Sequence, residues 1–242
     1  MDTKKIWTIL FIEDDERYRE TILMQLRDNI KNAFFIGVSD IDKALDIFSD
    51  ESNEKLKSVI LSQKEVLKQR DGSSKSYSFY ENEEAYIEQN KDKINIGCII
   101  LDMCNDANEN TGVKFIKEFR SKNKIAQIIA FSGELGKGLL SDDLIDQNKK
   151  DDFGVKQSIE RVKRKNPTLA AKMALQYYYE VLTVLEKGSF INEQSNNDPG
   201  ISEPELEMAI WSAYRQYKLL YRLNEANKAL REISEQLLST TD

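Results

Sequence analysis

The sequence of 242 residues contains no histidine. Its absence excludes Ser-His-Asp and Cys-His catalysis, zinc sites with histidine ligands and proton transfer through imidazole. The two cysteines, Cys98 and Cys104, lie six positions apart, a spacing that supports neither a disulfide framework nor a CxxC metal or redox site. Any chemistry of this chain therefore depends on carboxylates, lysines and hydroxyls, and we expect a reducing compartment.

Proline, glycine and long apolar runs are also scarce. Three prolines and ten glycines are too few for a collagenous or low-complexity chain. No apolar run approaches the ~18 residues that a membrane-spanning helix needs. With 35 basic and 42 acidic residues, the formal net charge of −7 disfavours broad binding to nucleic acid or anionic membrane. These features predict a soluble cytoplasmic protein of one or two domains.

Short apolar segments alternate with amphipathic helical patterns in the first part of the chain. Five segments are strand candidates because they are short, apolar and followed by polar residues: 6–12, 33–38, 94–101, 125–131 and a weaker one at 153–155. This alternation predicts βαβ units and a doubly wound, five-stranded parallel sheet. Residues 50–92 do not fit the pattern, and we interpret them as an insertion.

Carboxylates, a hydroxyl and an ammonium follow the predicted strands. Glu13 and Asp14 come after the first strand, Asp102 after the third, Ser132 after the fourth and Lys156 after the last. Because functional sites of parallel sheets lie at the carboxyl ends of the strands, we expect these side chains to gather at one edge. Neighbouring carboxylates repel unless they share a cation, and Mg²⁺ prefers such oxygen donors. In a chain without histidine, Asp102 is the available nucleophile, and carboxylates do accept phosphoryl groups.

Four short segments resemble, in the same order, the receiver domain of two-component response regulators. They are ILFIEDDE at 9–16, IILDM at 99–103, IIAFSG at 128–133 and DFGVK at 152–156. The resemblance implies a flavodoxin-like receiver fold over residues 1–157, with Asp102 as the phosphoacceptor. A histidine kinase or a phosphotransfer protein would supply the phosphoryl group.

The same resemblance implies a Mg²⁺ site next to the phosphoacceptor. Asp14, Asp102 and the backbone carbonyl of Cys104 would bind the ion directly, and Glu13 would act through water. The alternative of a Mg²⁺-dependent phosphohydrolase is weakened because Cys104 stands where such an enzyme would carry a second acidic residue, two positions after Asp102.

Further residues would act on the phosphoryl group itself. Ser132 and Lys156 would hold it, and Ser132 and Phe153 would be the switch residues that respond to its presence. Two features depart from the family pattern. Gln157 stands where a proline usually follows the lysine, and Gly112 lies ten residues after the phosphoacceptor rather than eight.

From about residue 158 the sequence pattern is helical only, which predicts a C-terminal helical module over 158–242. One helix is expected at 168–187 and a long one from 203, where Ser202 and Glu205 form a capping box. Apolar residues repeat at alternating spacings of four and three along the long helix, with one break of phase. A hairpin with the 168–187 helix and an intermolecular coiled coil both fit this stripe, and we predict a homodimer through the C-terminal helices.

Taken together, these patterns predict a phosphoacceptor signalling regulator with a protein as its output partner. Residues 158–242 carry 11 basic and 12 acidic residues, so a DNA-reading module is disfavoured and nucleic acid is not expected as a partner. We expect no enzymatic activity beyond self-catalysed phosphotransfer and autodephosphorylation. The alternative from the interaction class is a receiver-like scaffold that functions without phosphorylation.

Overall fold

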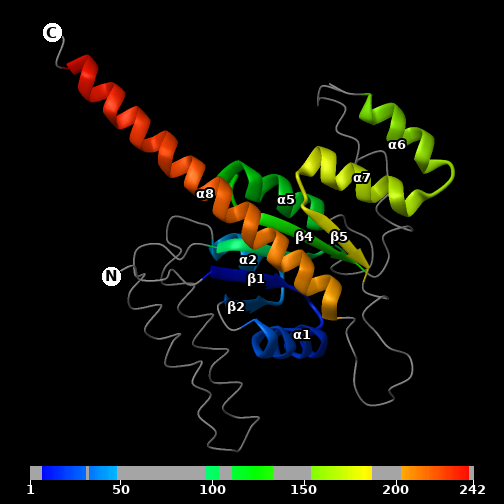
Figure 1. The fold of residues 1–242 in the computed structure, drawn as a ribbon. Coiled ribbons are helices and arrows are strands. Elements are labelled where there is room, and N and C mark those ends of the chain that lie inside the picture. The colour runs from blue at the N-terminus through cyan, green and yellow to red at the C-terminus, as the bar shows by residue number, and fades with distance from the viewer. Residues whose placement is uncertain are drawn as a thin grey trace, which may run out of the picture.

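The computed structural model describes residues 7–30, 33–47, 96–103, 111–132, 154–186 and 203–239. Within them, five strands form one sheet in the order β2-β1-β3-β4-β5, with all neighbours parallel (Figure 1). The strands are β1 (Trp7–Ile12), β2 (Ala33–Val38), β3 (Ile96–Asp102), β4 (Gln127–Ser132) and β5 (Thr183–Glu186). This is the strand order of the flavodoxin-like doubly wound fold, so the predicted fold class is confirmed.

Both faces of the sheet are covered by helices, and alternate residues of each strand point to opposite layers. Ile9 and Phe11 of β1 face α1 (Glu16–Asn29) and α8 (Glu203–Ser239). Leu10 and Ile12 face the layer that contains α2 (Ile41–Ile47), α5 (Thr111–Lys122) and α7 (Pro167–Tyr179). The strands β1 to β4 are therefore buried along their whole length, which explains their almost continuously apolar sequences.

The fifth strand is not where the sequence pattern placed it. Val155 begins a helix, α6 (Val155–Lys163), and the strand that pairs with β4 is Thr183–Glu186. The sheet therefore extends beyond the predicted domain boundary at 157, and residues 158–242 are not helical only. The predicted insertion at 50–92 lies outside the described residues.

The helix predicted at 168–187 ends early, at Tyr179. Glu180 then takes a left-handed conformation with φ of 55°, and its N–H donates back to the Leu175 carbonyl. Arg120 donates one hydrogen bond to the Glu180 carbonyl at 2.9 Å and another to the Ala126 carbonyl at 2.6 Å. This side chain ties the end of α7 to the segment that enters β4, and the chain can then join the sheet as β5.

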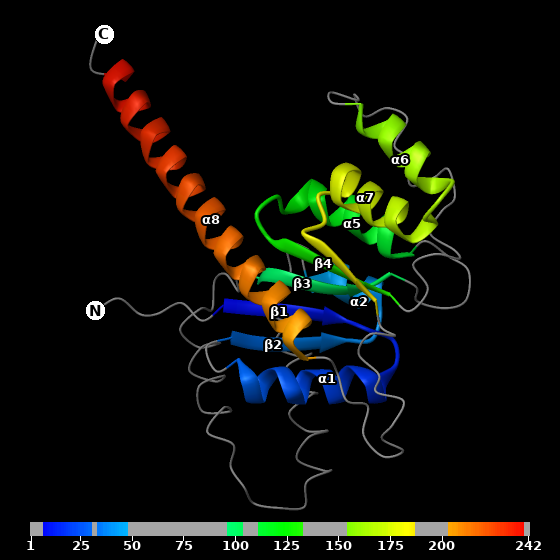
Figure 2. The same cartoon turned by 45° about the vertical axis from the view of Figure 1, so that its right-hand side comes forward.

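The long C-terminal helix begins at Glu203 as predicted, but it does not form the hairpin with the 168–187 segment. Its N-terminal part packs against β3 and β4, on the opposite face of the sheet from α7 (Figure 2). The sheet-facing residues of α8 are Leu206, Ala209, Ile210 and Ala213. Trp7 of β1 packs on Tyr214, with ring centroids 5.1 Å apart. Among the described residues, no helix is both long and apolar enough to cross a membrane.

We expect Leu206→Ala to lower the free energy of unfolding of the whole sheet domain by about 2–5 kcal/mol, because it leaves a cavity between α8 and the sheet. Leu206 is 1% exposed, whereas Leu238 of the same helix is 70% exposed. Leu238→Ala is therefore the matched control, with an expected change within about 0.5 kcal/mol. Urea unfolding monitored by circular dichroism tests this. Equal effects of the two substitutions would show that α8 contributes nothing to the stability of the sheet domain.

Candidate functional site

The register of the parallel strands brings the predicted carboxylates and the Ser132 hydroxyl to one edge of the sheet. Ile12 of β1 pairs with Leu101 of β3. The residues that follow them, Glu13 and Asp102, therefore lie next to each other at the ends of the two strands. Asp102 pairs with Phe131 of β4, and Ser132 follows it as the last residue of that strand. Ser132 is completely buried. This edge is the carboxyl edge, where doubly wound folds bind their ligands.

Three carboxylates meet at this edge. One carboxylate oxygen from each of Glu13, Asp14 and Asp102 lies within 4.8 Å of the others. Glu13 and Asp102 are buried, and Asp14 is exposed. Negative charges gathered in a partly buried site repel one another unless a cation shares them. A set of oxygen donors with one side open to solvent fits Mg²⁺, which keeps several waters and binds through a few carboxylates.

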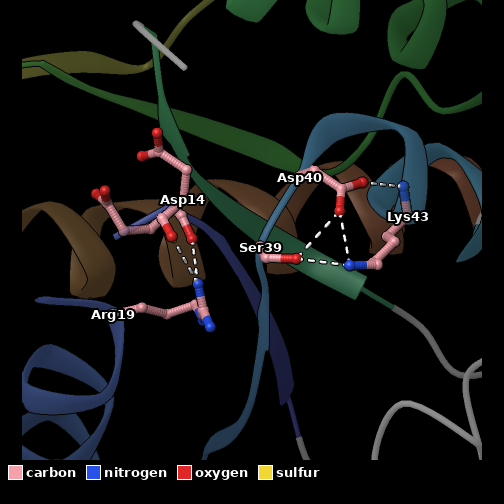
Figure 3. A network of polar contacts seen from close by, with 6 residues as sticks. Asp14, Arg19, Ser39, Asp40 and Lys43 are labelled. Carbon is pink, nitrogen blue, oxygen red and sulfur yellow. Dashed lines mark hydrogen bonds and ion pairs between the residues drawn. The ribbon is translucent and has the colours of Figure 1, made fainter. Parts of the chain in front are cut away.

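The loop between β1 and α1 is held by contacts that the sequence analysis did not identify. The guanidinium of Arg19 donates to the backbone carbonyl of Glu13 and, at 3.5 Å, to that of Asp14 (Figure 3). Asp15 caps α1, because its carboxylate accepts a hydrogen bond from the Tyr18 N–H at 2.9 Å. Helix and loop together position the two acidic side chains beside Asp102. An arginine at the first turn of α1 is the signal in the sequence, but only the fold shows that it reaches back to the loop.

Tyr18 is a second residue whose place at the site was missed. Its ring stacks on that of Phe131, with centroids 5.9 Å apart and an angle of 22° between the planes. Burial raises the pKa of the Tyr18 phenol well above its ordinary value, and the negative charges of Glu13 and Asp102 raise it further. The phenol therefore stays neutral at physiological pH and adds no charge beside the carboxylates. In the sequence, Tyr18 appears only as one position of an amphipathic helix.

A separate polar network lies at the end of β2 (Figure 3). Asp40 accepts a hydrogen bond from the Lys43 N–H at 2.7 Å and so caps α2, while the Lys43 ammonium lies 2.8 Å from the same carboxylate. Ser39 donates to Asp40 at 3.0 Å. Burial alone would raise the pKa of Asp40, but the hydrogen bonds from Lys43 and Ser39 lower it below its ordinary value. This carboxylate is thus already used for capping the helix.

The helix that follows β3 approaches the site closely. A Cβ added to Gly112, in the first turn of α5, would lie 2.9 Å from the Cα of Met103, the residue after Asp102. Any larger residue at this position would displace the backbone beside the candidate phosphoacceptor. The glycine whose spacing departs from the family pattern is therefore required here by the close approach of α5.

The ammonium is the part of the predicted site that the structure does not bring to the edge. Lys156 lies in the first turn of α6, and both ribbon views draw α6 on the far side of α7 from the sheet (Figures 1 and 2). The peptide bond before Gln157 is trans. Cys104 and Phe153 lie outside the described residues. Glu186, the last residue of β5, pairs with Ser132, and Lys187 is the next residue in the sequence.

No protein-family model matches the sequence, and no curated protein matches it. The chain is similar to several solved structures, and three of them follow. An adenylate cyclase from Rhodopirellula baltica is 13% identical over 91% of this chain and 96% of its own, with a TM-score of 0.43. A signal receiver domain of an HD domain-containing protein from Pseudomonas fluorescens Pf-5 is 10% identical over 88% and 97%, with a TM-score of 0.43.

The third structure is the response regulator protein TrrA from Thermotoga maritima in complex with Mg²⁺-BeF. It is 14% identical over 64% of this chain and 98% of its own, with a TM-score of 0.30. The fold class of this chain rests on its own strand order and register. Those features define a flavodoxin-like, doubly wound α/β fold with an acidic cluster at the carboxyl edge of its sheet and a long C-terminal helix.

Proposed function

We propose that the protein is a phosphoacceptor response regulator, phosphorylated on Asp102 by a histidine kinase or a phosphotransfer protein. The observation that carries this proposal is the place of Asp102. Its carboxylate is buried at the carboxyl end of the central strand β3, within 4.8 Å of the carboxylates of Glu13 and Asp14. The output would pass through the C-terminal helix to a protein partner.

The chemistry uses groups that this chain supplies. A carboxylate oxygen of Asp102 attacks the phosphorus of the donor, an O–P bond forms, and the bond from phosphorus to the leaving nitrogen or oxygen breaks. Mg²⁺, held by Asp14, Asp102 and the Cys104 carbonyl with Glu13 acting through water, would neutralise charge on the phosphoryl oxygens. The Ser132 hydroxyl, at the end of β4, is the group that we assign to donate to a phosphoryl oxygen.

The ammonium that pairs with the phosphoryl group is assigned here to Lys187 in place of Lys156. Two observations support the exchange. Lys187 follows β5 directly in the sequence, and the last residue of β5, Glu186, pairs with Ser132 at the carboxyl edge. A lysine directly after the last strand is also the position that the receiver family uses. Lys156 instead belongs to α6.

The proposal is tested by the intact mass of the protein after incubation with an acyl phosphate. With Mg²⁺ present we expect the mass of one phosphoryl group to be added, and with EDTA in place of Mg²⁺ we expect none. No gain under either condition would contradict the proposal and favour the phosphorylation-independent scaffold. Continuous release of phosphate from a simple phosphomonoester would favour the phosphohydrolase instead.

A further inference from the structure

The C-terminal half of α8 carries an apolar surface that the described part of the protein does not cover. The N-terminal part of the helix packs on the sheet, but every residue from Arg222 to Ser239 is exposed. Both ribbon views show this half projecting beyond the sheet (Figures 1 and 2). From Leu219 to Leu237 the helix rises by about 27 Å at about 1.5 Å per residue.

Six residues in this half repeat at alternating spacings of four and three without a break, and we call them the seam: Leu219, Leu223, Ala226, Leu230, Ile233 and Leu237. The five large side chains of the seam are 53% to 66% exposed. This spacing is the a and d pattern of a coiled coil, in which such residues pack between the residues of a facing helix. A soluble helix rarely leaves five large apolar side chains in one line without a partner.

The seam and the sheet-facing stripe of α8 lie on different sides of the helix. At about 100° per residue, the seam lies roughly 150° around the axis from Leu206, Ile210 and Ala213. Packing of α8 on its own sheet therefore turns the seam away from the sheet. The break of phase in the apolar repeat marks the change from a stripe that packs on the sheet to a stripe of exposed side chains.

The charges of this half point to a second copy as that partner. In the heptad that the seam defines, six of the seven charged residues of α8 after Tyr217 occupy positions b, c and f, away from the seam: Lys218, Glu225, Lys228, Arg231, Glu232 and Glu235. Only Arg222 flanks it, at a g position. Coiled coils that select a different partner commonly use charges at the flanking e and g positions. Here the flanks are mostly uncharged, so two identical seams meet without like-charge repulsion along their length.

We propose that α8 forms a two-fold symmetric coiled coil with α8 of a second copy, through the seam from Leu219 to Leu237. A two-fold axis places the same patch of each copy against the other, which suits a seam of identical apolar residues. The sheet-facing stripe stays on its own sheet in this dimer, so the two folded domains lie outside the coiled coil. The proposal goes beyond phosphorylation of Asp102 and does not depend on it.

Sedimentation equilibrium of the full, unphosphorylated chain tests the proposal with two matched variants. At about 100 μM, a concentration that detects association in the micromolar range, we expect the wild type to have twice the 28.0 kDa mass of one chain. Leu230→Glu places a charge in the seam, and we expect a single-chain mass. Leu238→Glu, at an equally exposed b position, should keep the dimer mass.

A monomeric wild type would overturn the proposal, and so would equal masses of the two variants. A stable trimer or tetramer lost in Leu230→Glu would overturn the two-fold dimer. Both substituted side chains are exposed, so the fold itself is not at risk, and circular dichroism checks that both variants keep their helix content. Because no phosphodonor is present, failure of this test and failure of the proposed phosphorylation are separate results.

Discussion

The Asp102→Asn variant should gain no phosphoryl mass from an acyl phosphate and Mg²⁺, under conditions in which the wild type gains one group. An amide keeps the size of the side chain but is not a nucleophile toward phosphorus, so the loss should be complete. Asp40→Asn is the matched control, because Asp40 lies at the same sheet edge but is engaged in capping α2. It should be phosphorylated like the wild type. Equal mass gain in Asp102→Asn and the wild type would place the phosphoryl group elsewhere.

A loss of phosphorylation in Asp102→Asn must also be distinguished from a loss caused by misfolding of the variant. Asp102 shares the edge with the carboxylates of Glu13 and Asp14, so a neutral amide removes repulsion when no Mg²⁺ is bound. We therefore expect Asp102→Asn to unfold in EDTA at the same temperature as the wild type or a higher one. A lower unfolding temperature would show that the substitution damages the fold.

The second large effect distinguishes the two lysines. Lys187→Ala should slow phosphorylation by acyl phosphate about 100-fold, which is the usual loss when one group that stabilises transition-state charge is removed. Lys156→Ala, in α6, should change the rate by less than about twofold. Rates of mass gain for the two variants check this directly. The opposite order would return the role to Lys156, and equal rates would assign it to neither residue.

Mg²⁺ binding provides a further control for the lysine variants. An ammonium pairs with phosphoryl oxygens and not with the cation, so Lys187→Ala should retain Mg²⁺ affinity while it loses phosphorylation rate. A titration that showed lost Mg²⁺ affinity in this variant would mean that the substitution disturbs the acidic cluster itself.

The sequence by itself determined four of the five strands and the acidic edge of the sheet. Strands buried on both faces must be almost continuously apolar. The sequence pattern therefore predicted β1 to β4 correctly. Because parallel strands end at the same edge, the residues that follow them could be placed together without coordinates. That argument located Glu13, Asp14, Asp102 and Ser132.

The lysine that we propose for the site, Lys187, could not be identified in the same way, because the sequence pattern does not show the strand that precedes it. The strand β5 has only four residues, and Val181 and Leu185 continue the apolar spacing of α7. The local sequence pattern therefore predicts one long helix across 168–187. Pairing with β4 is an interaction between residues more than fifty positions apart, and strand formation depends on such contacts more than on local preference.

Tertiary structure alone decided what the long helix contacts. The sequence shows two apolar phases along α8, but periodicity does not say which surface covers each phase. The fold assigns Leu206 and Ile210 to the sheet and leaves Leu230 in solvent. Likewise, only the fold brings Arg19 and Tyr18 to the acidic edge, because helix spacing identifies the face of a side chain and not the residue that it meets. Local patterns thus determine most elements, whereas a short strand such as β5 and the partners of each element follow from packing across the whole chain.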